Sequence, residues 1–223
     1  RIIAERDMSM EKNTTNQQMI HYKNYFLETG DIMSGVRPFI AESWMRCKEY
    51  GMQYGTEHEV KMKYITNGHL KHLLDTNREL IEAAHPTMSR LVNLVAGTQY
   101  VITLHDKNCV VLEHLFAGDY YMPNPFFNLG SIWSEEIMGT SGVPLCLRHD
   151  EGLQVIGEEH YAHYIRQATC TAVPLHNESG GIIGCLNMFG HMDNTHAHSL
   201  GLLQAVAWII EKQLLISRST KLI

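Results

Sequence analysis

The chain has 223 residues, of which 44% are hydrophobic, and a formal net charge of −6. This length fits one domain with an appendage, and the composition is sufficient for a buried core. The acidic balance excludes a global basic surface that would attract nucleic acid or an anionic membrane. No apolar run approaches the roughly 20 residues that span a bilayer, and the first residues lack the apolar h-region expected of a secretory signal.

The cysteines bear on where the protein works. There are five, scattered and without a C-x-x-C pair: Cys47, Cys109, Cys146, Cys170 and Cys185. An odd, scattered set predicts reduced thiols, and neither a disulfide framework nor a zinc knuckle. We therefore expect a cytoplasmic protein with no membrane partner.

The first 66 residues are predicted to form a helical extension followed by a linker. Residues 1–36 are polar and weakly patterned, and Asn-Thr-Thr-Asn at 13–16 should interrupt any helix there. Order in this stretch is expected only through docking on another element. Pro38 suits the first turn of a helix with apolar residues at helical spacing, namely Ile40, Trp44 and Cys47, before Gly51 ends it. A linker is expected at 52–66.

Residues 67–217 are predicted to form the main domain, and 218–223 to begin a further linker. Asn67 can cap a helix, and Pro86 should restart or kink that helix before Gly97. Its apolar positions follow the helical period: Leu70, Leu73, Leu74, Leu80, Ile81, Ala84, Met88, Leu91, Val92 and Val95.

The period then changes to that of β-strands. Tyr100–Leu104 and Cys109–Phe116 are β-rich and flank a turn at 106–108, which predicts a hairpin. An irregular stretch follows, and short helices are expected near 133–148 and 158–166.

A strand is predicted between those short helices, at Leu153–Ile156. A second hairpin joins Thr169–Leu175 to Gly181–Phe189 through a polar turn at 177–180, and a helix from about residue 197 to 217 closes the domain. This order predicts an α+β fold: an antiparallel sheet with helices on one face and a roof of loops and short helices over a ligand pocket on the other.

Alternation along the second hairpin separates the two faces of the sheet. With a four-residue turn at 177–180, the expected cross-strand pairs are Pro174 with Ile183, Ala172 with Cys185, and Cys170 with Asn187. The opposite face is bulky and suits packing on the terminal helices: Thr171, Val173, Leu175, Ile182, Leu186 and Met188. The first face is small or polar, so we expect it to leave a cavity for a small molecule.

The first hairpin is expected to divide in the same way. Its apolar face is formed by Tyr100, Ile102, Leu104, Val110 and Leu112. Thr103 and Glu113 are expected on the pocket face. A slip of one residue in the pairing would reverse either assignment.

Several segments, in order, resemble the GAF sensor domain of acetoin-catabolism-type, sigma-54-dependent transcription activators. The segment at 133–141, WSEEIMGTS, resembles the family's "WsE…GTN", and GEEHY at 157–161 resembles "G-x-E-H-F". The second hairpin, TCTAVPL and GGIIGCLN, resembles "tCsaaPI" and "G-x-i-x-G-x-L-D". HAH at 196–198, IE at 210–211, and the upstream helix IAESWMRC at 40–47 also match, so the resemblance covers about residues 36–216.

This resemblance implies a GAF-like fold, no enzyme activity, and a full-length protein with an AAA+ ATPase and a helix-turn-helix DNA-binding domain after residue 223. No G-x-x-x-x-G-K-[ST] loop occurs in this chain. The chain departs from the family at Ser141, where asparagine is usual, at Val143-Pro144 in place of Ile-Gly, and at Asn187 in place of aspartate. Because these positions lie in or near the expected pocket, the ligand of the best-known relatives is not assumed here.

The function expected is that of a regulatory domain that binds a small organic metabolite and relays this through the terminal helix. The candidate ligand-binding residues are Trp133, His160, Tyr164, Cys170, Ala172, Cys185, Asn187, Thr103 and Glu113. No cofactor is expected. A homodimer is expected, because the last helix also carries apolar residues outside its inner stripe, namely Leu202, Val206 and Ile209.

Two other interpretations stay open at this point. Cys170 and Cys185, or the histidines near His160 and His196, could make the domain a thiol redox or metal sensor, although no spacing typical of a metal site stands out. A cysteine nucleophile on the same fold is the third hypothesis, weakened by the lack of a basic neighbour that would lower a thiol pKa. Trp133 and Tyr164 are either pocket walls or core aromatics.

Overall fold

The computed structural model describes residues 2–52, 54, 62–118 and 125–221, with side chains described between Asn16 and Thr220. Five strands form one sheet in the order β2-β1-β5-β4-β3, and every neighbouring pair is antiparallel. They are β1 Val101–Asp106, β2 Val111–Phe116, β3 Leu153–Ile156, β4 Ala168–His176 and β5 Ile182–His191. The predicted α+β fold with an antiparallel sheet is confirmed.

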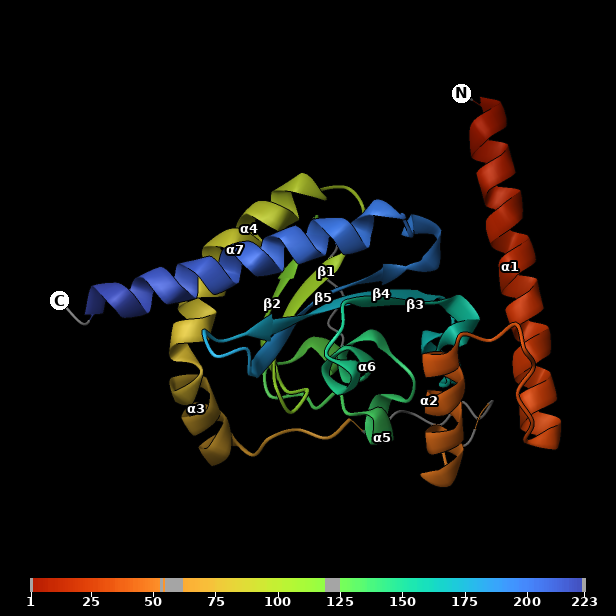
Figure 1. Cartoon of the computed structure of the whole chain (residues 1–223), viewed down its shortest axis with the longest axis horizontal. Coiled ribbons are helices and arrows are strands. Elements are labelled where there is room, and N and C mark those ends of the chain that lie inside the picture. The colour runs from red at the N-terminus through yellow and green to blue at the C-terminus, as the bar shows by residue number, and fades with distance from the viewer. Residues whose placement is uncertain (1, 53, 55–61, 119–124, 222–223) are drawn as a thin grey trace.

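Two long helices, α4 (Arg78–Leu94) and α7 (His198–Lys221), cover one face of this sheet (Figure 1), and α3 (Asn67–Thr76) leads into α4. The core on this side includes Met88, Ile102, Leu186 and Leu203. The helix expected after residue 67 divides at Asn77, and not at Pro86, which lies inside α4. Pro86 is exposed. A carbonyl that loses its helical partner on the solvent side can still bond to water, so the helix continues.

The length and composition of α7 would also suit a membrane span, over His198–Thr220, which the sequence analysis did not find. Its contacts give another reason for this apolar character. Leu203, Ala207 and Ile210 are buried against the sheet and α4, and Leu214 is also buried.

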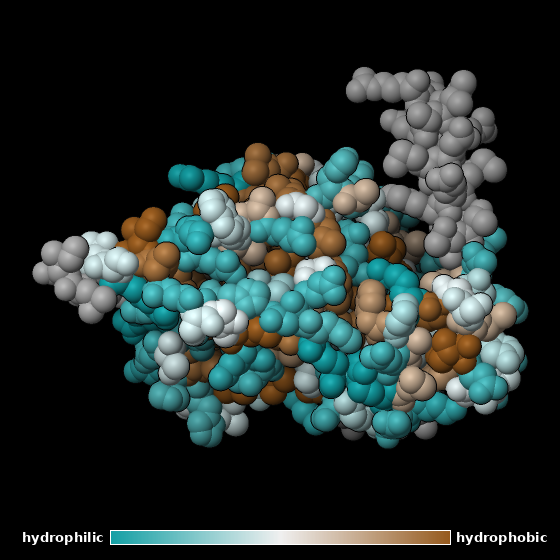
Figure 2. All heavy atoms as spheres, viewed as in Figure 1, coloured by the Kyte–Doolittle hydropathy of each residue, from teal (hydrophilic) through white to brown (hydrophobic). Residues whose placement is uncertain are grey.

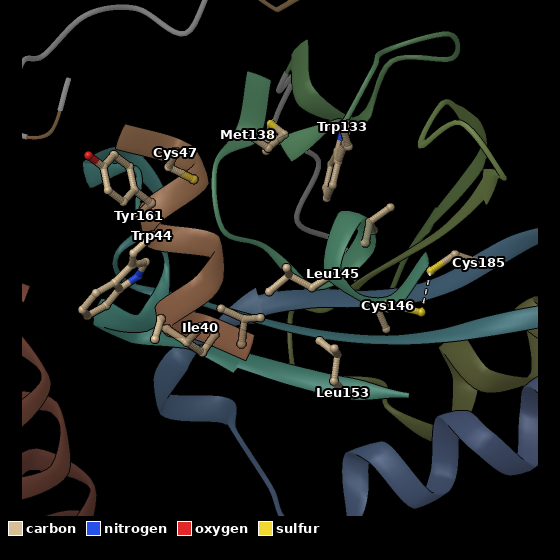
Figure 3. Close-up of a cluster of buried hydrophobic side chains, with 14 of the residues drawn as sticks. Ile40, Trp44, Cys47, Trp133, Met138, Leu145, Cys146, Leu153, Tyr161 and Cys185 are labelled. Carbon is tan, nitrogen blue, oxygen red and sulfur yellow. Dashed lines mark hydrogen bonds between the residues drawn. The ribbon is translucent and has the colours of Figure 1, made fainter. Parts of the chain in front are cut away.

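The other face carries the predicted roof. It consists of α5 (Glu135–Met138), α6 (Gly142–His149) and short 3-10 turns, with α2 (Pro38–Glu49) packed outside them. The turns are η1 Pro125–Phe127, η2 Gly157–Glu159, η3 His163–Ile165 and η4 Met192–Asn194. In Figure 3, Leu145 and Cys146 of α6 lie between the sheet and the α2 side chains of Ile40 and Trp44, so one core joins α2, the roof and the sheet.

The N-terminal helix α1 (Ile2–Thr29) corrects the expectation that residues 13–16 interrupt any helix. Its later turns dock on the roof, where Phe26 is 1% exposed and its ring lies 5.7 Å from that of Trp44. Tertiary packing of an apolar helix face contributes more to helix stability than intrinsic propensity does. The packing of Phe26 therefore outweighs the low helix propensity of residues 13–16.

Both hairpins contain a β-bulge that the sequence did not reveal. In the second, Ala172 pairs with Asn187 and Pro174 with Cys185, so the expected pairing was wrong by two residues. The register shifts between Leu175 and His176, beside the turn. Because side chains alternate with a period of two, a shift of two leaves the assignment of faces unchanged.

One ion-pair cluster joins the second hairpin to α7, and it makes the stability of the fold depend on pH. His176 Nε2 lies 2.6 Å from Asp150 Oδ1, and Nδ1 lies 3.1 Å from Glu211 Oε1. Burial lowers the pKa of His176, but the hydrogen bonds to both carboxylates outweigh it and raise the pKa above 6.5. The stabilisation is therefore complete below the unfolded-state pKa and is lost as pH rises through the folded-state value.

We expect His176→Gln to lower the free energy of unfolding by at most about 1 kcal/mol near pH 5.5, and by less near pH 8.5. Denaturant unfolding of both proteins at the two pH values measures this difference. An equal difference at both pH values would show that the charge of His176 does not contribute.

Candidate functional site

The small and polar face of the second hairpin lies under the roof, as predicted. Cys170, Ala172, Cys185 and Asn187 are each at most 1% exposed. Ala172 and Cys185 belong to the core beneath α6, whereas Val173 and Leu186 belong to the core beneath α4 and α7. Thr103 of β1 pairs with Asn187 across the strands and is also fully buried, so it joins this face.

A chain of uncharged polar groups runs across this face. Asn187 Nδ2 lies 3.0 Å from Thr103 Oγ1, which lies 2.9 Å from His105 Nε2. His105 Nδ1 lies 3.4 Å from the carbonyl oxygen of Cys109. Burial lowers the pKa of His105 to about 3, so its ring is neutral at physiological pH.

Aromatic rings adjoin this polar chain. The ring of Trp133 lies 5.0 Å from His105, 5.7 Å from Phe127 and 6.0 Å from Phe189. Sequence reasoning identified Trp133 but missed the other three. His105 and Phe189 could have been found, because each is two residues beyond a predicted site residue on the same strand and therefore shares its face.

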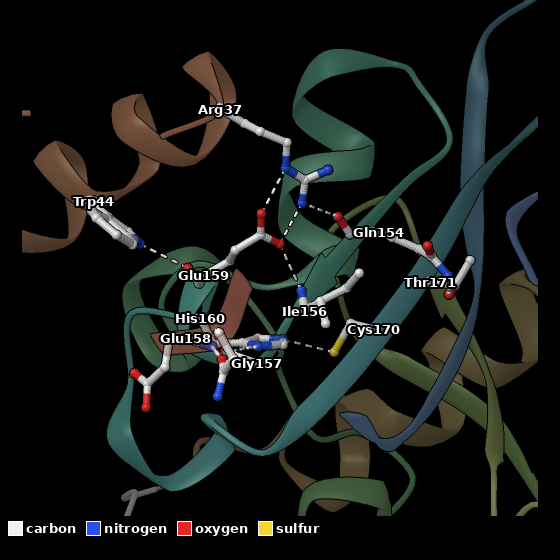
Figure 4. Close-up of polar contacts among 11 residues, drawn as sticks. Arg37, Trp44, Gln154, Ile156, Gly157, Glu158, Glu159, His160, Cys170 and Thr171 are labelled. Atoms are coloured by element: carbon white, nitrogen blue, oxygen red, sulfur yellow. Dashed lines mark hydrogen bonds and ion pairs between the residues drawn. The ribbon is translucent and has the colours of Figure 1, made fainter. Parts of the chain in front are cut away.

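His160 contacts Cys170, another predicted site residue (Figure 4). Its Nδ1 lies 2.9 Å from the Gly157 carbonyl, which fixes the proton there, so Nε2 accepts from the Cys170 thiol at 3.3 Å. Burial lowers the pKa of His160 to about 3 and raises that of Cys170 to about 12. Both groups are neutral, so this Cys–His pair is not an activated nucleophile.

Helix α6 lies directly on the sheet and fills the space expected above Ala172. A Cβ added at Gly142 would lie 2.9 Å from Cys170 Cβ and 3.3 Å from Ala172 Cβ. The expectation of an open cavity over Cys170 and Ala172 is therefore wrong. Two hollows lie elsewhere: about 360 Å³ beside Tyr54 and Tyr161, and about 260 Å³ between His176 and α7.

Two predicted site residues lie apart from the others. Glu113 lies on the helix side, where its Oε1 contacts His85 Nδ1 of α4 at 2.5 Å. The bulge between Leu104 and His105 shifts the pairing by one residue, so Glu113 points to the face covered by α4 and not to the face under the roof. Tyr164 is 39% exposed and stacks on Phe126 at 5.5 Å, so it covers the roof from outside.

The roof is held by charged groups from the N-terminal helices. Lys23 of α1 is fully buried, 3.2 Å from Glu158 Oε2, and its Nζ also contacts the His160 carbonyl. Desolvation lowers the pKa of Lys23 to about 8, and Glu158 opposes this. In Figure 4, Arg37 reaches Glu159 and the Gln154 carbonyl, and Trp44 Nε1 donates to the Glu159 carbonyl at 2.8 Å. The residues around His160 are thus fixed by α1 and α2.

A second cluster fixes the turn before α6. Glu135 accepts hydrogen bonds from Ser43 Oγ at 2.6 Å and from Arg46 Nε at 2.7 Å. Ser43 Oγ also lies 2.7 Å from Thr140 Oγ1. Because α2 supplies Ser43 and Arg46, these hydrogen bonds join α2 to α5 and to the segment that leads into α6.

The fold and this site define a class: an α+β domain that encloses an uncharged polar site under a helical roof on one face of its sheet. Comparison with known families agrees. The GAF domain model matches residues 79–214, so the chain belongs to the GAF domain family.

Two relatives are transcriptional regulators. The chain is 32% identical to a signal-transduction and transcriptional-control protein of Clostridium beijerinckii and 28% identical to the acetoin dehydrogenase operon transcriptional activator AcoR of Bacillus subtilis. These alignments cover 81% and 80% of this chain, but the chain spans only 28% and 30% of the relatives. The fold matches a chain of the E. coli DhaR(N)–DhaL complex with a TM-score of 0.72 at 17% identity, covering 83% of this chain and 63% of that one.

Proposed function

We propose that this chain is the ligand-sensing regulatory domain of a bacterial, cytoplasmic, sigma-54-dependent transcription activator. It binds a small, uncharged organic metabolite between the sheet and α6. The observation that carries the proposal is the buried polar chain from Asn187 to His105 beside the ring of Trp133. Few polar groups next to aromatic walls are typical of small-molecule sites. The neutral thiols and imidazoles favour binding over catalysis.

The ligand acts by changing the position of α6 relative to the sheet. In the closed arrangement α6 contacts Cys170 and Ala172 directly, so a bound molecule must displace it. That displacement moves Glu135 and η2, which are bonded to α2 and α1, and alters the sheet that packs on α7. The helices transmit the change to an AAA+ ATPase and a helix-turn-helix domain. Such a switch requires different ligand affinities for the two arrangements.

Ligand capture tests this proposal. The purified protein is incubated with a metabolite extract, separated from unbound material, and denatured, and the released molecules are identified by mass spectrometry. A ligand should raise Tm with concentration as RT ln(1 + [L]/Kd) requires. Enrichment of no molecule over a heat-denatured control, with no Tm shift, would contradict the proposal.

We also propose a homodimer through α7. Trp208, Ile209 and Ile216 of this helix are 59%, 39% and 64% exposed, whereas Val206, expected outside the inner stripe, is buried within the domain. Figure 2 shows hydrophobic side chains at the surface near the C-terminal part of α7. Apolar residues outside the inner stripe are buried when two copies pair.

Trp208→Glu is expected to convert the dimer to a monomer in light scattering, since it places a charge in an apolar contact. The matched control is Gln204→Glu, an exposed position on the same helix. A wild-type protein that stays monomeric at high micromolar concentration would contradict the proposed dimer.

A second candidate function is thiol redox sensing, with Cys146 and Cys185 as the pair in place of Cys170 and Cys185. Cys185 Sγ lies 3.7 Å from Cys146 Sγ of α6 (Figure 3), whereas Cys170 Sγ contacts His160. Oxidation by hydrogen peroxide would join the two sulfurs, with the two thiol hydrogens and two electrons leaving in two water molecules. Burial raises the pKa of Cys185, which slows this reaction. Thiol titration before and after peroxide treatment tests it: loss of two thiols that Cys146→Ala prevents would favour the redox function.

A further inference from the structure

One buried polar atom of the site has no hydrogen-bond partner among the described residues. Asn187 is fully buried, and its Oδ1 has no hydrogen-bond partner among the residues that the structure describes. Buried polar atoms are nearly always paired, because an unpaired one costs about 1–3 kcal/mol. Ser141 Oγ, at the start of α6, is likewise buried and unpaired there. Its neighbour Gly142 lies over Ala172, the strand partner of Asn187, so both atoms belong to one region.

The polar chain determines whether the missing partner is a donor or an acceptor. The Cys109 carbonyl can only accept, so His105 Nδ1 carries the proton and the neutral ring accepts at Nε2. The hydroxyl of Thr103 must then donate to His105. The Thr103 oxygen accepts a hydrogen bond from the amide nitrogen of Asn187, so the other amide atom, Oδ1, is the one left without a partner. The partner that Asn187 lacks is therefore a hydrogen-bond donor.

The surroundings limit the charge of that donor. The nearest side chains on this face are Thr103, Cys185, Phe189 and Ala172, and none carries a charge. An ammonium group buried here would have no carboxylate among these four neighbours, which is unfavourable for a buried charge. The adjoining rings of Trp133, Phe127 and Phe189 present apolar surface.

We propose that Asn187 Oδ1 accepts a hydrogen bond from an uncharged hydroxyl group of the ligand, whose apolar part packs on these three rings. The ligand class is thus a small neutral alcohol or phenol. This inference rests on the proposed function, since it names the chemistry that the same site recognises. Thr103 acts as a positioning residue, because it sets which way the Asn187 amide points.

Matched probe pairs test the inference directly. In each pair one molecule has a hydroxyl and the other a similar skeleton without a donor: 2-butanol with 2-butanone, and phenol with anisole. Concentration-dependent shifts in Tm give the apparent Kd of each probe. At least one hydroxyl compound should bind about 5- to 150-fold more tightly than its partner, the range that an unpaired buried acceptor implies.

Two variants separate recognition from stability. Asn187→Leu should abolish the preference for the hydroxyl compound, while Tm without probe changes little, because removal of the unpaired Oδ1 offsets the lost hydrogen bond from Nδ2 to Thr103. Thr103→Val should reduce the preference because the amide is free to turn. The control Asn93→Leu, exposed on α4, should change neither.

The possible failures are distinguishable. Equal affinity within both pairs for the wild type would show that water satisfies Asn187, which overturns this inference and leaves the ligand site standing. Failure of every probe would overturn this inference, and if no molecule is captured from a metabolite extract either, the proposed function itself is overturned. An unchanged hydroxyl preference in Asn187→Leu would assign recognition to another residue and also contradict the inference.

Discussion

Replacing Glu158 by leucine is expected to destabilise the domain by about 3–5 kcal/mol, the usual effect of removing one member of a buried ion pair. Lys23 is fully buried and its Nζ lies 3.2 Å from Glu158 Oε2. It also lies over the rings of Trp44 and Tyr54, 5.5 and 5.0 Å from their centroids. Without the carboxylate this ammonium group keeps its desolvation cost and loses its main compensation. Denaturant unfolding followed by circular dichroism measures the effect.

The double variant Lys23→Met, Glu158→Leu provides the comparison, because it removes both charges and should be more stable than Glu158→Leu alone. Asp75→Leu is the matched control, since Asp75 pairs with Arg78 at the surface and its loss should change stability little. A Glu158→Leu protein as stable as the wild type would show that α1 is not anchored through Lys23.

The lowered pKa of Lys23 adds a pH signature to this comparison. The value is about 8 in the folded protein against 10.5 in the unfolded chain, so the penalty for burying the charge is present below pH 8. It disappears as pH rises from about 8 to about 10.5, because the unfolded state then binds more protons. The stability of the wild type relative to Lys23→Met should therefore rise over this interval.

Gly142→Ala is expected to destabilise the domain by about 1–3 kcal/mol, the usual cost of overpacking. The added methyl group would lie 2.9 Å from Cys170 Cβ and 3.2 Å from the Cys170 carbonyl oxygen, so α6 must move away from β4. The matched control is Gly201→Ala in α7, where nothing lies within 4 Å and alanine favours the helix.

Unfolding of both variants should show opposite signs, with Gly201→Ala neutral or stabilising. Gly142→Ala should also increase the hydrogen-exchange rates of the α6 amides more than those of the β4 amides, because the substitution displaces the roof. Equal stability of Gly142→Ala and the wild type would mean that α6 is loosely placed, and that a ligand enters without displacing it.

The sequence predicted the elements of the main domain well where one periodicity dominates. Leu153–Ile156 was placed without error, and the two faces of the second hairpin were correct despite a register that was wrong by two residues. The prediction for Glu113 failed because a bulge of one residue has no signal in the residue pattern and reverses the face. The continuity of α1 through residues 13–16 was not predicted, because this helix is stabilised by the distant contacts of Phe26 and Lys23 and not by local propensity.

The strand residues of the candidate site were predictable from alternation, whereas the roof residues Trp133 and His160 were named from segments that resemble the family. Thr103, Cys170, Ala172, Cys185 and Asn187 follow from alternation along two hairpins. The position of Phe127 depends on an irregular segment, so no periodic signal exists for it. The contact of Gly142 with Cys170 decides whether the site is open, and it depends on distances that residue types alone do not specify.

The anchoring of the roof by Lys23, Arg37 and Trp44 has a practical consequence for dissecting this protein. All three residues precede residue 79, where the match to the GAF family begins. A fragment cut at the family boundaries would leave Glu158 and Glu159 without their cations and strip the outer layer from the roof. A fragment intended to keep these contacts must therefore include α1 from before Lys23, well upstream of the position where the match to the GAF family begins.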